Sequence, residues 1–140
     1  MVKKGQSKDI IISTNKSRLN LKLIYNFLKK ESYWAKNTSL AQVETSIKNS
    51  LSIGIYRDKK QVGFVRVITD YSTFAYLSDF FVLKRYRGRG YAKMLLEYII
   101  KHPKLQNLRM MLLITKDGHG LYKKFGFKKP QNSNLIMVRI

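Results

Sequence analysis

The spacing of the apolar residues changes near residue 50, and this change limits the folds that the chain can adopt. Between residues 17 and 30 the apolar side chains recur at positions i, i+3, i+4 and i+7, which predicts a helix with one buried face. Ser39 and Gln42 form a capping-box pattern, which predicts the start of a second helix. From Leu51 onward the apolar residues alternate instead, as they do in half-buried strands. The chain therefore combines two N-terminal helices with a sheet.

The other apolar runs predict the order of the elements up to the strongest helix. A β-branched run at 10–12 predicts a first strand, and residues 58–60 are typical of a hairpin turn between two later strands. A further strand is expected over 74–83. Residues 92–100 keep helical spacing until His102-Pro103, where the helix is expected to end.

Three elements are expected in the C-terminal third. The continuous apolar run within 109–115 is typical of a strand covered on both faces. A short helix through residues 121–125 is closed by Gly126, and residues 135–140 supply a last strand. The resulting order, β-α-α-β-β-β-α-β-α-β, predicts an α+β fold: a mixed, mostly antiparallel sheet with helices on both faces.

The size and composition of the chain restrict its class. A chain of 140 residues suits a single domain over 1–140, with residues 1–9 expected to be a frayed terminus. Cysteine is absent, which excludes disulfides and cysteine-ligated metals, and the two histidines suggest no metal site. No apolar run approaches the roughly 20 residues of a membrane span, and the N-terminus lacks the apolar core of a signal peptide. These features predict a cytoplasmic protein that does not bind membranes.

The net charge is extreme, because 28 Lys and Arg residues face 8 Asp and Glu residues, giving +20. A field of this sign attracts polyanions such as nucleic acid or a phosphate-rich ligand. The alternative is compositional, because Lys, Ile and Asn are abundant together, as expected from an AT-rich genome. The charge is spread along the chain and forms no tail, which favours the compositional interpretation.

The segment 80–92 carries the clearest chemical signal. A strand runs into a turn with two glycines, Gly88 and Gly90, and the strongest predicted helix follows at once. The first turn of a helix has unpaired N–H groups and a partial positive charge, and glycines let them approach an anion. Arg87 and Arg89 add fork-shaped donors. The segment therefore predicts a cradle for phosphate or pyrophosphate.

This segment has other interpretations. A Gly-x-Gly before a helix is often only a tight turn, and Arg-Gly-Arg-Gly also occurs in RNA-binding tails. Such tails are long and repeated, whereas this copy is single and lies between two apolar elements. The Gly-Lys-Ser/Thr of nucleoside triphosphatases and the glycine spacing of dinucleotide folds are both missing.

Two motifs in this chain resemble those of the GNAT superfamily of acetyl-CoA-dependent N-acetyltransferases. Residues 87–92, Arg-Gly-Arg-Gly-Tyr-Ala, fit the signature Arg/Gln-x-x-Gly-x-Gly/Ala, as does a register two residues earlier. The later register is preferred because Ala92 then opens the apolar helix face. Residues 121–127, Leu-Tyr-Lys-Lys-Phe-Gly-Phe, resemble the second common signature, and residues 115–122 resemble a bacterial subgroup. The resemblance runs from about residue 50 to the C-terminus.

The resemblance implies how acetyl-CoA would be held. In this family two central strands splay apart, and the cofactor fills the gap between them. Carried over to this chain, Phe81 and Val82 would offer backbone groups to the pantetheine arm. The pyrophosphate would be held by residues of the turn: Arg87, Gly88, Arg89, Gly90, Tyr91 and Ala92. His119 stands where many members have an Asn that contacts the cofactor arm, which puts that contact in doubt; the alternative is a helix-start or surface residue.

The resemblance also implies direct attack of a neutral amine on the thioester. Tyr122 matches the position of the usual general acid, although a core aromatic would have the same spacing. Asp79 is the candidate base because it interrupts an apolar strand, but it could instead orient substrate, act through water, or pair with Arg66. Tyr76 and Glu31 are weaker candidates for the base.

The acceptor is a small-molecule or protein amine that the sequence does not identify. Its pocket is expected to be aromatic, from residues that could equally be core: Tyr33, Trp34, Tyr71, Phe74 and Tyr76. Two alternatives to an N-acetyltransferase stay open: a basic nucleic-acid-binding module, which the compositional interpretation of the charge disfavours, and a GNAT fold that binds CoA without turnover. A homodimer is neither predicted nor excluded.

Overall fold

The structure is a computed structural model that describes residues 9–140; residues 1–8, which make up most of the terminus expected to fray, lie outside the described part. The strands are β1 (Ile10–Ser13), β2 (Leu51–Arg57), β3 (Lys60–Thr69), β4 (Phe74–Val82) and β5 (Met110–Leu113). The helices are α1 (Leu21–Lys30), α2 (Leu40–Lys48), α3 (Tyr91–Lys101) and α4 (His119–Lys123). Short 3-10 turns lie at Lys16–Arg18, Lys84–Tyr86, Pro103–Leu105 and Ser133–Leu135.

The five strands form one sheet in the order β1-β2-β3-β4-β5. The pairs from β1 to β4 are antiparallel, and β4 pairs with β5 in parallel. A crossover through α3 accounts for the parallel pair, since parallel neighbours need a long connection. The sheet is therefore mixed and mostly antiparallel, as the sequence predicted.

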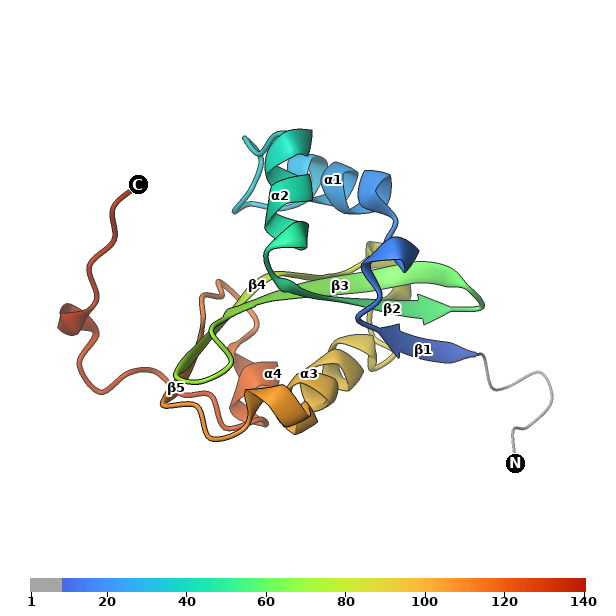
Figure 1. The fold of residues 1–140 in the computed structure, drawn as a ribbon. Coiled ribbons are helices and arrows are strands. Elements are labelled where there is room, and N and C mark those ends of the chain that lie inside the picture. The colour runs from blue at the N-terminus through green and yellow to red at the C-terminus, as the bar shows by residue number, and fades with distance from the viewer. Residues whose placement is uncertain (1–8) are drawn as a thin grey trace, which may run out of the picture.

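Helices cover both faces of the sheet, which confirms that part of the predicted fold (Figure 1). The helices α1 and α2 lie on one face, over a core that includes Ile24, Phe27 and Phe81. The helices α3 and α4 lie on the other face, where Leu95, Leu96 and other α3 residues pack on the sheet. Each face thus has its own apolar core.

Local signals explain where several elements begin and end. The capping box of α2 forms as predicted, with the Ser39 and Gln42 side chains each accepting a backbone N–H bond. The hairpin between β2 and β3 turns through Asp58 and Lys59, both at positive φ, which is the conformation of a two-residue type I′ turn. Gly126 has φ +90° three residues after α4 ends at Lys123.

Three predictions about the elements were wrong in part. The helix expected from residue 17 begins at Leu21, because Asn20 caps it by accepting the Leu23 N–H. The strand β5 is shorter than the run 109–115 and is not covered on both faces, since Met110 is 56% exposed. Residues 135–140 form no strand: they extend away from the sheet after the turn Ser133–Leu135 (Figure 1). The strand propensity of these residues is not enough to form a strand, because they pair with no neighbouring strand among the described residues.

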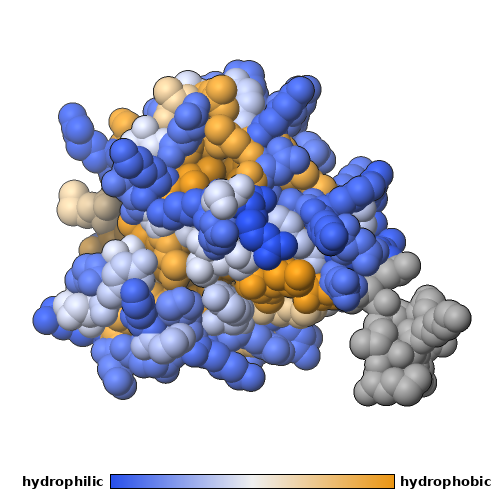
Figure 2. Space-filling model, turned by 45° about the vertical axis from the view of Figure 1, so that its right-hand side comes forward, coloured by the Kyte–Doolittle hydropathy of each residue, from blue (hydrophilic) through white to orange (hydrophobic). Residues whose placement is uncertain are grey.

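The surface is mainly hydrophilic, with hydrophobic patches between the polar side chains on the face drawn in Figure 2. Among residues 9–140, none of the helices has the length and apolar character that a bilayer crossing requires. The same residues include no group of three His, Asp or Glu side chains placed to hold a metal ion.

Candidate active site

The strands β4 and β5 separate halfway along β4. Their pairing runs only from Phe74 and Met110 to Leu77 and Leu113, whereas β4 continues to Val82. The second half of β4 therefore has no strand on its β5 side within the described residues. The separation leaves a cavity of about 270 Å³. It is lined by Trp34, Tyr76, Leu77, Ser78, Asp79, Phe80, Leu113, Ile114, Thr115, Asp117, Gly118 and Tyr122.

A β-bulge in β4 shapes one wall of this gap. The register with β3 passes from Phe64 opposite Phe81 to Arg66 opposite Ser78, so β4 carries one extra residue there. Asp79 lies in the bulge with φ +52°, a region that Asp tolerates better than most residues. The bulge bends the strand and turns the Asp79 side chain toward the side of the sheet that α1 and α2 cover.

Beyond the bulge, Val82 presents its backbone to the gap. Its carbonyl accepts a bond from Arg87 Nε at 3.0 Å, while the next residue, Leu83, donates its N–H to Val62 of the β3 side at 2.8 Å. Since backbone groups alternate in direction along a strand, Val82 faces the gap and Phe81 faces β3. The Phe81 ring is buried and stacks on Phe27 with centroids 3.9 Å apart. The geometry favours the N–H of Val82, whose carbonyl is bonded to Arg87, over the backbone groups of Phe81 as a free donor.

Asp79 is held by a hydrogen-bonded network. One carboxylate oxygen accepts from Arg66 Nε at 2.8 Å, and the other accepts from Trp34 Nε1 at 2.9 Å. Arg66 also donates to the hydroxyls of Ser50 and Ser78. The Arg66 and Asp79 side chains are only 12% and 10% exposed. The pairing of Asp79 with Arg66, one of the alternatives left open by the sequence, is confirmed.

The loop between α1 and α2 contacts both sides of the gap. Trp34 bonds to Asp79 of β4, and the neighbouring Tyr33 Oη accepts the backbone N–H of Lys116, which follows β5, at 2.9 Å. The two rings meet edge to face, with centroids 5.0 Å apart. Two adjacent aromatic residues thus fix the distance between the two walls at this end of the gap.

Tyr122 lies on α4, half-buried between the rings of Phe80 and Phe127. A Cβ atom on Gly118 would lie 2.8 Å from the Tyr122 ring, so only glycine permits this approach. Burial is the main cause that raises the pKa of Tyr122 to about 12, with smaller contributions from Tyr33 and Asp117. The phenol therefore keeps its proton at neutral pH.

The glycine turn forms at the start of α3 in a conformation that leaves its amides free. Gly88 and Gly90 have φ +76° and +85°, and no atom lies within 4 Å of where their Cβ atoms would be. The helix α3 has no side-chain cap, and no hydrogen bond in the described part of the chain uses the N–H groups of residues 88–93. Six successive donors therefore remain available beside the C-terminal end of β4.

The two arginines of the turn are partly engaged within it. Arg87 bonds to the Val82 carbonyl, and Arg89 lies over the Tyr86 ring at 5.6 Å. The backbone N–H groups of the turn are therefore freer to bind a ligand than these guanidinium groups are.

The structure brings some of the predicted residues together and not others. Tyr122, Asp79, Trp34 and Tyr76 all line the gap. His119 lines a neighbouring cavity on the other side of Tyr122. The other residues predicted for the acceptor pocket or as a base, Glu31, Tyr33, Tyr71 and Phe74, do not line the gap. Burial raises the pKa of Tyr76, with Asp79 adding to the effect, so this hydroxyl stays protonated and is no base at neutral pH.

Sequence reasoning missed two residues of the gap. Asp117 lines it, is exposed, and accepts no hydrogen bond from any of residues 9–140. Gly118 permits the position of Tyr122 and donates its N–H to Thr115 Oγ1 at 2.9 Å. The sequence shows the glycine in the run Thr-Lys-Asp-Gly, but its role depends on its contact with the ring of Tyr122, four residues later in α4.

Splayed strands, a β-bulge and an uncapped helix behind a glycine turn occur together at this site. The Acetyltransferase (GNAT) family matches residues 21–127, and this chain belongs to that family.

Similar proteins agree with this assignment. The structure of a candidate GNAT acetyltransferase from Xanthomonas campestris superposes with a TM-score of 0.91 and 45% sequence identity, covering 94% of this chain and 93% of that one. A candidate acetyltransferase of Gibberella zeae is 29% identical over 143 residues, covering 86% of this chain and 80% of its own length. A predicted acetyltransferase from Clostridium acetobutylicum, solved with acetyl-CoA, shares the fold with a TM-score of 0.67 at 12% identity, covering 95% and 96% of the two chains.

Proposed function

We propose that this chain transfers an acetyl group from acetyl-CoA to a primary amine by direct attack. The observation that carries the proposal is the run of six free backbone N–H groups at residues 88–93, beside a strand gap that contains a protonated Tyr122. The proposal treats residues 1–140 as one N-acetyltransferase domain acting in the cytoplasm, as the sequence led us to expect.

The residues present fit acetyl-CoA. The turn at Gly88 and Gly90 offers amides and a helix N-terminus, which suit a diphosphate, and the space at both Cβ positions is open. Val82 offers its backbone N–H on the open side of β4, which suits a carbonyl of an amide-bearing arm, while its own carbonyl accepts from Arg87. Tyr91 and Ala92 begin α3 and contribute the next N–H groups. Acetyl-CoA supplies, when bound, an acetyl thioester open to nucleophilic attack.

Tyr122 serves best as a hydrogen-bond donor to the departing sulfur. Its pKa of about 12 lies several units above that of an ordinary thiol, about 8.5, so full transfer of its proton to a thiolate is unfavourable. A hydrogen bond from the phenol still stabilises the developing negative charge in a site partly shielded from water. The Tyr122 hydroxyl therefore lowers the barrier without losing its proton.

Asp79 is proposed as a positioning residue. Both of its oxygens already accept bonds, so it holds Trp34 and Arg66 in place against the bulge. Asp117 is the other carboxylate of the gap, and it accepts no hydrogen bond from the described residues. We propose that it accepts the proton of the attacking amine, directly or through water.

Binding and turnover are tested separately. Acetyl-CoA and CoA should each raise the melting temperature, since a ligand that prefers the folded state stabilises it, whereas an oligonucleotide should not. Stabilisation by the oligonucleotide alone would favour a nucleic-acid-binding module instead.

Turnover is measured as thiol release that depends on an added amine. Tyr122→Phe should lower kcat by about 10²-fold, the usual cost of losing one donor to a developing charge. Asp117→Asn should also lower kcat, whereas Tyr71→Phe, away from the gap, serves as the matched control for Tyr122→Phe. CoA binding with no release for any amine tried would favour the alternative of a fold that binds CoA without turnover.

A further inference from the structure

The gap between β4 and β5 differs in charge from the rest of the molecule. The chain carries 28 Lys and Arg residues against 8 Asp and Glu residues, yet no Lys, Arg or His among residues 9–140 lines this gap. The charged residues that do line it, Asp79 and Asp117, are both acidic. An anionic group would find no positive side chain there, whereas an ammonium group would find carboxylates.

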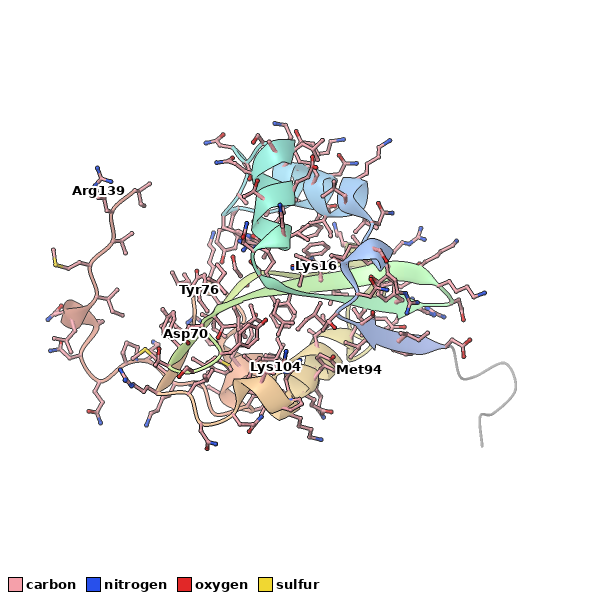
Figure 3. The ribbon with its side chains drawn as sticks, in the orientation of Figure 1. Lys16, Asp70, Tyr76, Met94, Lys104 and Arg139 are labelled. Atoms are coloured by element: carbon pink, nitrogen blue, oxygen red, sulfur yellow. The ribbon has the colours of Figure 1, made fainter. Side chains whose placement is uncertain are left out.

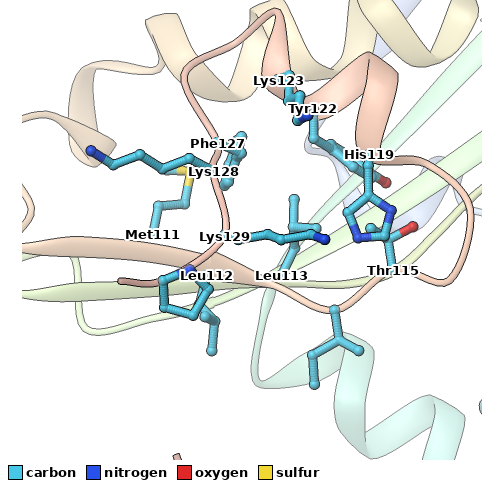
Figure 4. Close-up of a pocket in the computed structure, with 12 residues that line it drawn as sticks. Met111, Leu112, Leu113, Thr115, His119, Tyr122, Lys123, Phe127, Lys128 and Lys129 are labelled. Atoms are coloured by element: carbon cyan, nitrogen blue, oxygen red, sulfur yellow. The ribbon is translucent and has the colours of Figure 1, made fainter. Parts of the chain in front are cut away.

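The neighbouring cavity beside β5 shows that the lack of positive side chains is local to the gap. That cavity, of about 250 Å³, lies on the other side of Tyr122 (Figure 4). Its lining includes three lysines and a histidine: Lys123, Lys128, Lys129 and His119. Residues 113–115 and Tyr122 line both spaces. Positive side chains therefore gather on one side of Tyr122 and acidic side chains on the other.

Two positive side chains adjacent to the lining residues are held by other groups. Arg66 is ion-paired with Asp79 at 2.8 Å and also donates to two serine hydroxyls. The Lys116 ammonium lies over the Tyr33 ring, 5.6 Å from its centroid. The Asp117 carboxylate makes no ion pair within the described part of the chain. Because the charges of Arg66 and Asp79 cancel, Asp117 leaves the gap with a net negative charge.

Aromatic rings form much of the remaining lining of the gap. The side chain of Tyr76 lies on the side of the sheet that carries α1 and α2, since its two neighbours in β4 pack in the core under α3 (Figure 3). Trp34, from the loop between α1 and α2, lines the same gap, as do Phe80 and Tyr122. The face of an aromatic ring is negative and attracts a cation within about 6 Å. The rings and Asp117 together suit a positively charged ligand.

We propose that the acceptor is an aliphatic diamine, and that the rings of Trp34 and Tyr76 hold its second ammonium group. This inference rests on the proposed function and names the class of acceptor for the same site. A simple monoamine loses its only charge before it reacts, so the rings would have no cation to hold. Bound CoA adds the negative charge of its diphosphate at the nearby turn, so the diamine should bind more tightly when CoA is present.

The reaction of the diamine uses the residues already assigned. One ammonium group loses a proton to solvent, and its neutral nitrogen attacks the thioester carbon. The C–S bond breaks as the amide bond forms, and the surplus proton of the nitrogen passes to Asp117. The sulfur keeps the electron pair of the broken bond and accepts a hydrogen bond from Tyr122. The distal ammonium keeps its charge throughout, so the gap can recognise it in both substrate and product.

Three amines with the same number of carbons test which charge the gap recognises. The compounds 1,4-diaminobutane, butylamine and 4-aminobutanoate differ at the end away from the amine, which is an ammonium, a methyl or a carboxylate group. Their binding is measured by titration calorimetry with and without CoA. The diamine should bind about 10-fold more tightly than butylamine, and 4-aminobutanoate should bind most weakly. Equal binding of the diamine and butylamine, tighter binding of 4-aminobutanoate, or no binding of the diamine would overturn the proposal.

Two exposed positions allow a lysine to be added inside or outside the gap. Ile114 lines the gap and is 72% exposed, whereas Met110 does not line it and is 56% exposed. Ile114→Lys should weaken binding of the diamine about 5-fold, because it places a like charge beside the distal ammonium. Met110→Lys adds the same charge to the chain and should keep the affinity. Equal losses in the two variants would contradict recognition of the diamine by the gap.

Amine-dependent thiol release in the same series separates this proposal from the proposed function. Binding in the expected order with no release for any of the three amines would support the diamine site and contradict acetyl transfer. Release with the same kcat/KM for all three amines would support acetyl transfer and overturn the diamine as the acceptor. A preference for the diamine in both binding and release would support both.

Discussion

Tyr56 has a buried hydroxyl that accepts and donates no hydrogen bond among the described residues. The side chain is 3% exposed, and Arg18 lies over its ring. A buried polar atom without a partner carries a desolvation cost and no compensating bond. Tyr56→Phe should therefore leave stability unchanged or raise it by up to about 1 kcal/mol, measured by thermal unfolding. A clear loss of stability would reveal a water bound to the hydroxyl.

Tyr122 should make the stability of the protein sensitive to alkaline pH. Burial is the main cause that raises the pKa of Tyr122 in the folded state to about 12, above the ordinary value of 10. Between these values the unfolded chain loses this proton before the folded chain does, so stability falls as the pH rises through the window. The melting temperature of the wild type should therefore fall relative to that of Tyr122→Phe from pH 10 to 12. A constant difference would show that Tyr122 is not shielded from water.

The start of α3 depends on two glycines in left-handed conformations. Gly90→Ala should cost about 1 kcal/mol, because φ +85° is unfavourable for a residue with a Cβ atom. The strain should also displace the free amides, so the stabilisation by CoA should fall together with the melting temperature. Gly120→Ala is the matched control: no atom lies within 4 Å of its Cβ position, it has no positive φ, and it lies inside a helix. It should be neutral or slightly stabilising, with CoA binding intact.

The ion pair between Arg66 on β3 and Asp79 on β4 is expected to be strongly coupled. Arg66→Met leaves the Asp79 carboxylate with Trp34 alone, and removing one partner of a buried pair typically costs about 3 kcal/mol. Asp79→Asn in addition should recover part of that loss, so a double-mutant cycle should give a favourable coupling energy. Additive effects of the two substitutions would mean that the pair does not hold the bulge.

The charge of the whole molecule should govern how the proposed CoA binding responds to salt. A chain that carries +20 attracts a diphosphate, and raising the ionic strength from about 0.01 to 0.15 M shortens the screening length from about 30 to 8 Å. The stabilisation by CoA should therefore fall with added salt, measured as the shift in melting temperature at several salt concentrations. A shift that does not change with salt would mean that the net charge does not assist binding.

The extent to which the sequence predicted the fold varies between elements. The capping box at Ser39, the hairpin at Asp58 and Lys59, and the helix after Gly90 were predicted because each depends on a few neighbouring residues. The last strand was not predicted correctly, since strand formation requires a partner strand that can lie far away in the chain. The short β5 shows the same limit: its apolar run did not ensure coverage on both faces.

What the amino-acid sequence determined by itself is the order of helices and strands, the family signatures, and the glycine turn with its free amides, because these arise from local conformation. The tertiary structure decided which distant side chains meet: Asp79 with Arg66 and Trp34, and Tyr33 with the backbone of Lys116. The bulge that turns Asp79 toward them is a property of the register between β3 and β4, and no residue of β4 alone specifies that register.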